Sequence, residues 1–158
     1  MNRFLILLAL IAALAVPASA SAAPVYWVGT HGTPGVYDFV GIPFETLKLR
    51  TSGGKVSIKT LQAVMACTDR SDGRVSPVAF DIYNNGVQAT LRRNKFVLNL
   101  TRVSNGRLAA VRISGTLGSN GRGTARVRLL GNSRDSTTGQ LLEECEREVT
   151  ISLRRGPR

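Results

Sequence analysis

The chain has 158 residues, a formal net charge of +11 at pH 7, two cysteines and one histidine. This length suits a single domain with its own hydrophobic core. A metal site built on cysteine and histidine would need more of these residues than the chain has. The excess of positive charge favours contact with polyanions, such as acidic cell-wall polymers, anionic lipid headgroups or nucleic acid.

The N-terminus has the three-part layout of a secretory signal peptide. Arg3 precedes an apolar run from Phe4 to Val16, and small residues follow. The apolar run is shorter than the roughly 20 residues that a membrane-spanning helix needs. We therefore expect residues 1–22 to be a signal peptide, with cleavage after Ala20 or Ala22; the alternative is that the segment is retained as an uncleaved anchor. After cleavage, the remaining chain is secreted or associated with the cell envelope, without a transmembrane segment.

The two cysteines, Cys67 and Cys145, are expected to form a disulfide, because paired cysteines are usual in exported proteins. A catalytic Cys–His pair or a Ser–His–Asp triad would have to use His31, the only histidine. Asp38 and Asp81, which could serve glycosidase chemistry as a pair, are scattered along the chain. The sequence thus favours a protein that is not an enzyme and that holds no cofactor.

Residues 23–35 are expected to be an irregular N-terminal segment, with aromatic residues among glycines. It contains either a short leading strand at Val25–Val28 or an aromatic lip for a ligand. Residues 36–155 are expected to form one antiparallel β domain, beginning with a strand at Val36–Gly41. Residues 156–158 form a basic tail.

Apolar and polar residues alternate on both sides of Gly53-Gly54, which predicts a hairpin with Leu49 opposite Ile58. After the turn, the apolar residues that face inward occupy even positions up to Ile58. They then change to odd positions, from Leu61 to Cys67. A β-bulge near Thr60 would reconcile the two phases. Because strands bend at bulges, the pattern favours a curved sheet.

The segment Asp69–Gly73 is rich in oxygen-bearing side chains. It could supply ligands to Ca²⁺, but it lacks the five-position acidic pattern and the distal glutamate of a dedicated calcium loop. We therefore interpret it as a solvated turn.

A ladder of hairpins follows, with two-residue turns predicted at Asn85-Gly86, Arg93-Asn94 and Asn105-Gly106. Each turn sets apolar residues opposite one another on neighbouring strands. The predicted pairs are Ile82 with Ala89, Phe80 with Leu91, Leu91 with Phe96, Ala89 with Leu98, Leu98 with Ile113, and Leu100 with Val111.

The next turn, at Asn120-Gly121, needs a different loop. A two-residue loop would set inward Ile113 against outward Arg128, so we predict a three-residue loop with Gly121 in the left-handed region. Ile113 then meets Val127, and Gly115 meets Ala125.

Towards the C-terminus, Gly131–Gln140 is expected to be a polar loop, and Cys145–Leu153 the last strand. Arg154–Arg158 is expected to be disordered. These elements predict an all-β fold: an antiparallel meander of about eight to nine strands, curved into a barrel or a two-layer sandwich, with one disulfide.

No acidic residue lies between Asp81 and Asp135, although basic residues are frequent there. Strand parity places Arg112, Arg126 and Arg128 on the outer face. Pairing the last two strands sets Arg126 opposite Glu148 and Arg128 opposite Glu146, which indicates charge pairing on a solvated face. Five basic residues have no such partner and are the candidate anion-binding residues: Arg92, Arg93, Lys95, Arg102 and Arg107.

Three functions are compatible with this pattern. The first is an exported non-enzymatic β domain that binds an anionic envelope or extracellular polymer through a basic face. The alternative is a barrel-type carrier of a small apolar ligand, and the third is a secreted hydrolase. Nucleic acid is a poor match, because aromatic residues are not interleaved with the basic ones: only Phe96 lies among them, and it has inward parity.

Parts of the sequence resemble a class of exported proteins. These parts are the strand pair around Ser52-Gly53-Gly54-Lys55-Val56 that ends at Cys67, the segments Ile113–Leu117 and Gly123–Val127, and Cys145 before a basic-ended strand. Together they are similar to exported all-β proteins of high-GC Gram-positive bacteria. No activity is assigned to those proteins, so the resemblance implies export and an all-β fold, and no site residues.

Overall fold

The computed structural model describes residues 23–32, 45–83, 86–104 and 107–157, without the side chains of 102–104 and 107–108. The expected signal peptide and the expected strand at Val36–Gly41 lie outside these residues. The described residues form nine strands and no helix, so none of them forms a helix that could cross a membrane. The strands are β1 (Val25–His31), β2 (Glu45–Ser52), β3 (Lys55–Asp69), β4 (Val75–Tyr83), β5 (Gln88–Thr90), β6 (Lys95–Ser104), β7 (Arg107–Leu117), β8 (Arg122–Arg134) and β9 (Leu141–Gly156).

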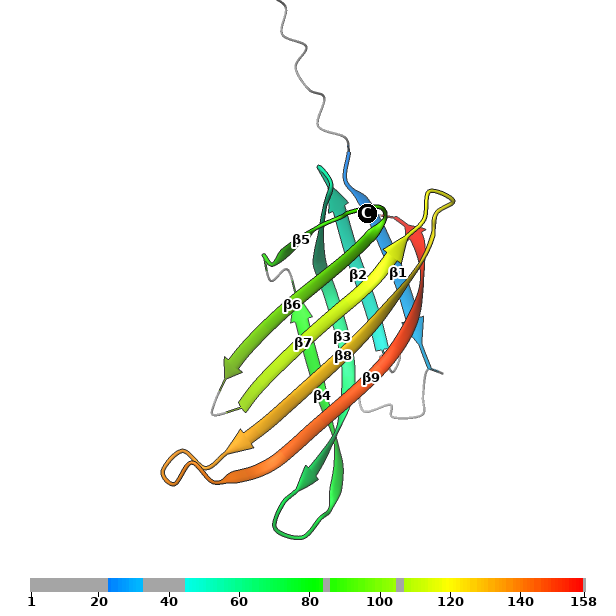
Figure 1. The fold of residues 1–158 in the computed structure, drawn as a ribbon. Coiled ribbons are helices and arrows are strands. Elements are labelled where there is room, and N and C mark those ends of the chain that lie inside the picture. Colours follow the sequence, from blue (N-terminus) through cyan, green and yellow to red (C-terminus); the bar gives the residue numbers. More distant parts are fainter. Residues whose placement is uncertain (1–22, 33–44, 84–85, 105–106, 158) are drawn as a thin grey trace, which may run out of the picture.

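All nine strands belong to one antiparallel sheet, in the order β4-β3-β2-β1-β9-β8-β7-β6, with β5 beside β3 (Figure 1). The first and last strands therefore pair in the middle of the sheet. β3 also pairs with β9, so hydrogen bonds close a ring through β3, β2, β1 and β9. The predicted all-β antiparallel fold is confirmed.

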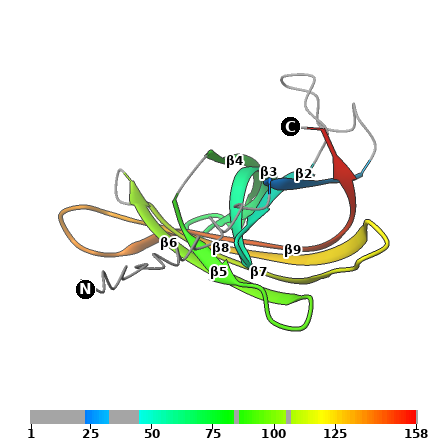
Figure 2. The same cartoon turned by 90° about the horizontal axis from the view of Figure 1, so that it is seen from above.

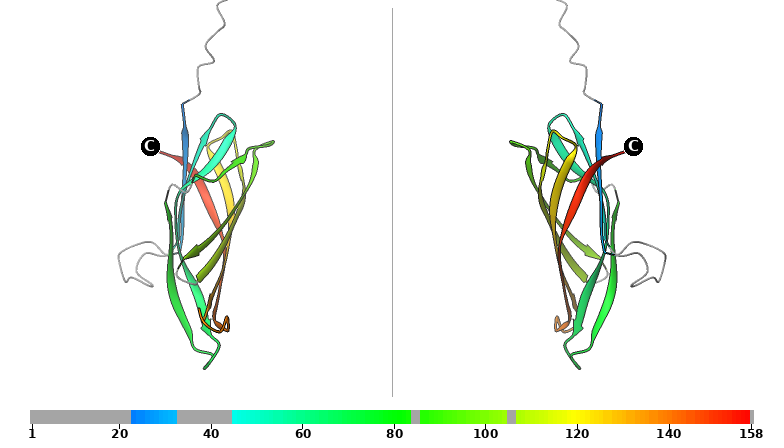
Figure 3. Two further views of the ribbon diagram at one scale, coloured as in Figure 1. Left: turned by 90° about the vertical axis from the view of Figure 1, so that its left-hand side faces the viewer. Right: turned by 90° about the vertical axis from the view of Figure 1, so that its right-hand side faces the viewer.

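The curved sheet folds over itself, so that β1–β4 and β6–β9 face each other (Figures 2 and 3). Apolar side chains from both halves fill the space between them as one core. Its fully buried members include Leu47, Leu49, Ile58, Leu61, Ile82, Leu98, Ile113, Val127, Leu129 and Ile151.

The β2–β3 hairpin has the predicted register. Leu49 pairs with Ile58, and the turn at Gly53-Gly54 joins the pair Ser52 and Lys55. The register then shifts by one residue, because Leu49 pairs with Ile58 whereas its neighbour Lys48 pairs with Thr60. This is the predicted bulge, and it turns Leu61, Ala63, Met65 and Cys67 inward.

The β6–β7–β8 registers are also confirmed. Leu98 pairs with Ile113 and Leu100 with Val111, although residues 105–106 lie outside the described part. Ile113 pairs with Val127. The β7–β8 loop has three residues between Gly118 and Arg122. The amide of Gly118 donates a hydrogen bond to the carbonyl of Arg122, at 2.8 Å. Gly121 has φ +78°, as predicted for a left-handed position.

The predicted hairpin at Asn85-Gly86 is wrong. β4 and β5 do not pair with each other there; both run antiparallel to β3, one after the other. Ile82 pairs with Leu61, and Ala89 pairs with Val56. The physical reason is the length of β3, which at 15 residues offers partners to both segments in succession. A local turn signal cannot show this competing partner.

The turn at Arg93-Asn94 is confirmed, since both residues have positive φ and Arg92 bridges to Lys95. The bridge is isolated, and no described strand pair continues it. The predicted pairing of Ala89 with Leu98 is therefore wrong, because β5 pairs along β3 instead.

Both ends of the described part of the chain form more regular strand than predicted. β1 extends over Val25–His31 and pairs with β2 along its whole length, so the first described segment is a strand. β8 continues to Arg134, which shortens the predicted polar loop. The predicted disordered tail is wrong for residues 154–156: this end of β9 hydrogen-bonds β1, with Trp27 paired to Arg155.

Candidate functional site

The fold separates the predicted anion-binding residues into two groups. Arg92, Arg93 and Lys95 are exposed around the tight turn that precedes β6. Arg102 and Arg107 belong to the far end of the β6–β7 hairpin, where Arg102 pairs with Ala109 and Arg107 with Ser104. The five residues thus do not form one site. A site that includes Arg92, Arg93 and Lys95 must draw its other members from neighbouring segments.

Those neighbours are brought in by backbone hydrogen bonds between turns. The amide of Leu91 donates to the carbonyl of Gly54 in the β2–β3 turn, at 2.8 Å. The amide of Leu117 donates to the carbonyl of Asn94, at 2.9 Å. The turn before β6 is therefore fixed between the β2–β3 turn and the end of β7.

The same end of the sheet includes the C-terminal part of β9. The amide of Arg155 donates to the carbonyl of Gly121 in the β7–β8 loop, at 3.0 Å. Arg155 also pairs with Trp27 on β1, and its guanidinium carbon lies 5.5 Å from the centre of the Trp27 ring. Segments remote in sequence are thereby joined at one end of the molecule, the upper end in Figure 1.

We call six exposed basic residues of this end, all outside the β2–β3 turn, the cationic rim. Its members are Arg92, Arg93, Lys95, Arg122, Arg154 and Arg155. The described residues 46–68, 86–104, 107–134 and 149–157 contain no aspartate or glutamate. Within the described part of the chain, no ion pair joins a member of the rim to a carboxylate.

One open depression of about 460 Å³ lies on the rim. It is lined by the β7–β8 loop from Ser119 to Arg122 and by Arg154 and Arg155. Guanidinium groups, a hydroxyl and a carboxamide surround it, and they donate hydrogen bonds to anions. The depression can bind an anion, and the described residues that line it include no carboxylate or histidine for acid–base chemistry.

The sequence indicated only part of this rim. Arg122 lies in the acid-free run, yet nothing local shows that it lies at the same end of the sheet as the turn before β6. The predicted disordered tail includes Arg154 and Arg155. The available signal was the alternation that continues from Ile151 and Leu153, which could have extended the last strand to residue 155.

The outer stripe of arginines differs from the rim because it is charge-balanced. Arg126 contacts Glu148 at 2.5 Å, and Arg128 contacts Glu146 at 3.5 Å. These predicted ion pairs are present, but the predicted register is wrong: Arg128 is directly opposite Glu148. The ion pairs are diagonal, because long side chains reach the neighbouring position along the strand.

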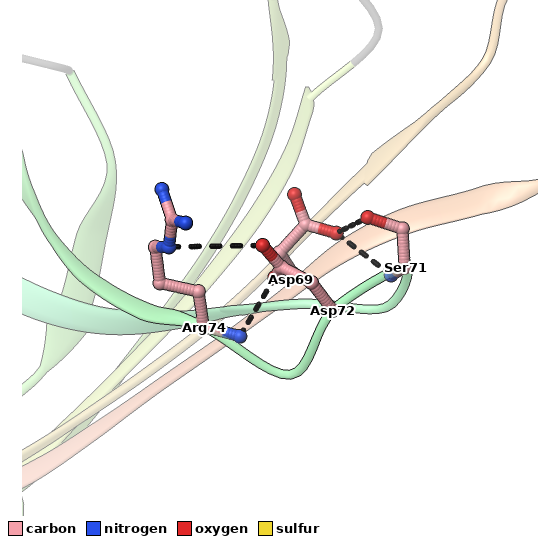
Figure 4. Close-up of polar contacts among 4 residues, drawn as sticks. All are labelled: Asp69, Ser71, Asp72 and Arg74. Carbon is pink, nitrogen blue, oxygen red and sulfur yellow. Dashed lines mark hydrogen bonds and ion pairs between the residues drawn. The ribbon is translucent and has the colours of Figure 1, made fainter.

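The opposite end of the sheet carries the acidic turns. In the β3–β4 turn, Asp69 accepts hydrogen bonds from the amide and hydroxyl of Ser71, and Asp72 accepts one from the amide of Arg74 (Figure 4). The Ser71 hydrogen bonds lower the pKa of Asp69 below its usual value. In the β8–β9 turn, hydrogen bonds from Thr138 and Thr137 likewise lower the pKa of Asp135.

The β3–β4 turn closes on its own side chains, as expected of a solvated turn. The guanidinium of Arg74 lies 3.6 Å from the carboxylate of Asp72, and Arg70 pairs with Glu144 of β9. Across the described ranges, no three His, Cys, Asp or Glu side chains are grouped so that they could hold a metal ion.

The residues considered for catalysis are dispersed. His31 is exposed at the end of β1. Asp81 is exposed on β4 opposite Gln62, and Asp38 lies outside the described residues.

A buried ion pair was missed by the sequence analysis. Glu45 of β2 is 0% exposed, and one of its oxygens accepts a hydrogen bond from Nε of Arg147, at 2.6 Å. Strand parity could have found it, because Glu45 precedes inward Leu47 by two positions and Arg147 lies between inward Cys145 and Val149.

The predicted disulfide between Cys67 and Cys145 is present, and it joins directly opposed residues of β3 and β9. It is compatible with an extracellular location. Comparisons with protein-family models, with curated protein sequences and with solved structures found no match.

Proposed function

We propose that this protein is an exported, non-enzymatic binding domain that holds an anionic polymer of the cell envelope or extracellular space through the cationic rim. The observation that carries the proposal is the gathering of basic residues from distant segments on one hydrogen-bonded end, without a carboxylate among the described residues there. A rim of this kind attracts anions and offers them several donors at once.

The contrast between the rim and the outer stripe supports this proposal. On the stripe, Arg126 and Arg128 lie beside glutamates, so their charges are largely compensated. On the rim the cations face solvent, and no ion pair among the described residues compensates their charges. Like charges repel over about 8 Å at physiological ionic strength, and a bound polyanion removes this repulsion.

The packing of the core favours this function over a carrier of an apolar ligand. A carrier needs an open apolar interior. Leu98, Ile113 and Val127 are instead buried in the core, and Phe80 and Leu91 pack against it. The anionic polymer is therefore the better-supported ligand.

The test is the affinity of the purified mature protein for a soluble polyanion, measured by fluorescence anisotropy with labelled polyglutamate at several salt concentrations. The rim variant Arg92→Gln/Arg122→Gln/Arg154→Gln removes three exposed charges from three segments. If each contact contributes roughly 0.5 kcal/mol, the affinity should fall about tenfold. It should also depend less steeply on salt than the affinity of the wild type.

The matched control is Arg70→Gln/Arg74→Gln/Arg134→Gln, which removes the same charge from the opposite end of the sheet. This variant should bind the polyanion much like the wild type. An equal loss of affinity in both variants would mean that net charge alone attracts the polymer. Binding that does not weaken as salt rises would refute the electrostatic mechanism.

A further inference from the structure

A second polar depression lies on the outer face of the sheet beside the β2–β3 turn. Directly opposed residues of three strands form it: Arg50 of β2 pairs with Ser57 of β3, and Ser57 pairs with Gln88 of β5. In the next row, Ser52 pairs with Lys55. These five side chains line a groove of about 230 Å³, which we call the donor groove.

The chemistry of the donor groove is uniform. A guanidinium, an ammonium, two hydroxyls and a carboxamide line it, and each of these groups can donate a hydrogen bond. The lining includes no carboxylate that would compete with an anion. The groove therefore matches an oxyanion that accepts several hydrogen bonds from different directions.

Arg50 gives a more specific indication. Its Nε is buried and has no hydrogen-bond partner, and no described carboxylate forms an ion pair with its guanidinium. A buried donor without an acceptor is unfavourable, so an acceptor is expected nearby in the functional state. An oxyanion in the groove would supply that acceptor.

The donor groove is continuous with the cationic rim. Lys55 follows Gly54, whose carbonyl accepts the hydrogen bond from Leu91 at the turn before β6. A polymer lying along the rim can therefore reach the groove across a single turn. This connection relates the groove to the same ligand as the rim.

We propose that the donor groove recognises the phosphate of a phosphodiester polymer whose repeating unit also carries hydroxyl groups. The inference rests on the proposed function of the rim and names the class of polymer. Arg binds phosphate through parallel hydrogen bonds, and the ammonium of Lys55 adds a point charge. Serine hydroxyls and the Gln88 carboxamide both donate and accept hydrogen bonds, so they can bind the hydroxyl groups of the polymer.

The experiment compares two polyanions of matched length and charge, poly(glycerol phosphate) and polyglutamate, by competition against labelled polymer. The wild type should bind the phosphodiester polymer about tenfold more tightly than polyglutamate. Arg50→Lys keeps the charge but not the parallel hydrogen bonds, so the preference should fall to about twofold or less. Its affinity for polyglutamate should stay unchanged.

A second variant, Arg50→Gln, removes the charge as well and should also lose the preference. Its control is Arg112→Gln, which removes the same charge from an exposed position on β7. It should keep the preference that Arg50→Gln loses. Thermal unfolding of each variant verifies that it is folded. Two further probes test other sources of phosphate. Vesicles of phosphatidylglycerol test a lipid surface, because this headgroup also carries a phosphodiester and hydroxyl groups. Inorganic phosphate tests the free anion.

The outcomes separate the two proposals. Equal affinity of the wild type for both polymers would overturn the phosphate inference and leave the rim proposal intact. Failure to bind either polymer would overturn both. Arg50-dependent binding of vesicles or of inorganic phosphate, without a preference for the phosphodiester polymer, would overturn the polymer as the ligand. A preference that Arg50→Lys does not reduce would show that the groove is not its source.

Discussion

Glu45 is the single buried charged residue among those the structure describes. Its parity places it with the inward residues of β2, and Arg147 is at an inward position of β9. One carboxylate oxygen accepts a hydrogen bond from Arg147, and the other, Oε2, has no partner. Removing a carboxylate from water is costly, so Glu45 depends on the guanidinium beside it.

Arg147→Met should therefore destabilise the protein strongly, because it leaves a buried carboxylate without a counter-charge. We expect a loss of about 3 kcal/mol in the free energy of unfolding, the lower end of the usual range, because the Arg147 side chain is 31% exposed. Urea unfolding followed by Trp27 fluorescence measures it. The double variant Glu45→Leu/Arg147→Met should recover most of the loss. If the double variant is as unstable as the single one, the ion pair is not the cause.

Alternation alone predicted inward and outward positions correctly over most of the chain, and it also predicts both members of this pair as inward. The pairing could not be predicted, because it joins β2 to β9. Their proximity follows from the hydrogen-bonded ring in which β1 lies between them. No local pattern in the sequence encodes contact between residues 102 positions apart.

Among the elements, β3 shows how a single extra residue shapes the fold. The register shift adds one residue to β3, Lys59, which separates the even inward positions up to Ile58 from the odd ones that begin at Leu61. The bulge also bends the strand, whose far end pairs with β9 and places Cys67 opposite Cys145.

Deleting Lys59 should therefore preserve the phase of β3, since Ile58 and Leu61 would both still point inward. Deleting Gln62 should reverse the phase of everything after it, which turns Cys67 outward. Mass spectrometry after thiol alkylation should show a disulfide in the first variant and free thiols in the second. A disulfide in both variants, or free thiols in both, would contradict this account of the bulge.

The hairpins differ in how well the sequence predicted them. The β2–β3, β6–β7 and β7–β8 registers follow from short loops and apolar pairing, which are local properties. The hairpin predicted at Asn85-Gly86 is wrong because of a partner that is not local. There β4 and β5 find better partners on β3, whose inward residues Val56 and Leu61 accept Ala89 and Ile82.

At the scale of the whole molecule, the charges are separated between the two ends of the sheet. Most of the described acidic side chains gather at the turns Asp69–Asp72 and Asp135–Gln140 and along the first half of β9; the other two are Glu45 of β2 and Asp81 of β4, and none belongs to the rim. The sequence predicted an acid-free run of basic residues. It could not predict the rim, which depends on the pairing of β1 with β9 and on hydrogen bonds between turns.

The disulfide stabilises the whole molecule, because it lies where β3 meets β9 and the hydrogen-bonded ring closes. It links residues 78 positions apart, and a crosslink over a loop of this length restricts the unfolded chain by about 4 kcal/mol. Reduction should lower the free energy of unfolding by about this amount, as measured by urea unfolding with and without reductant. The variant Cys67→Ala/Cys145→Ala should show a similar loss and no response to reductant. A loss of less than about 1 kcal/mol on reduction would mean that the pairing of β3 with β9 holds the ring closed without the crosslink.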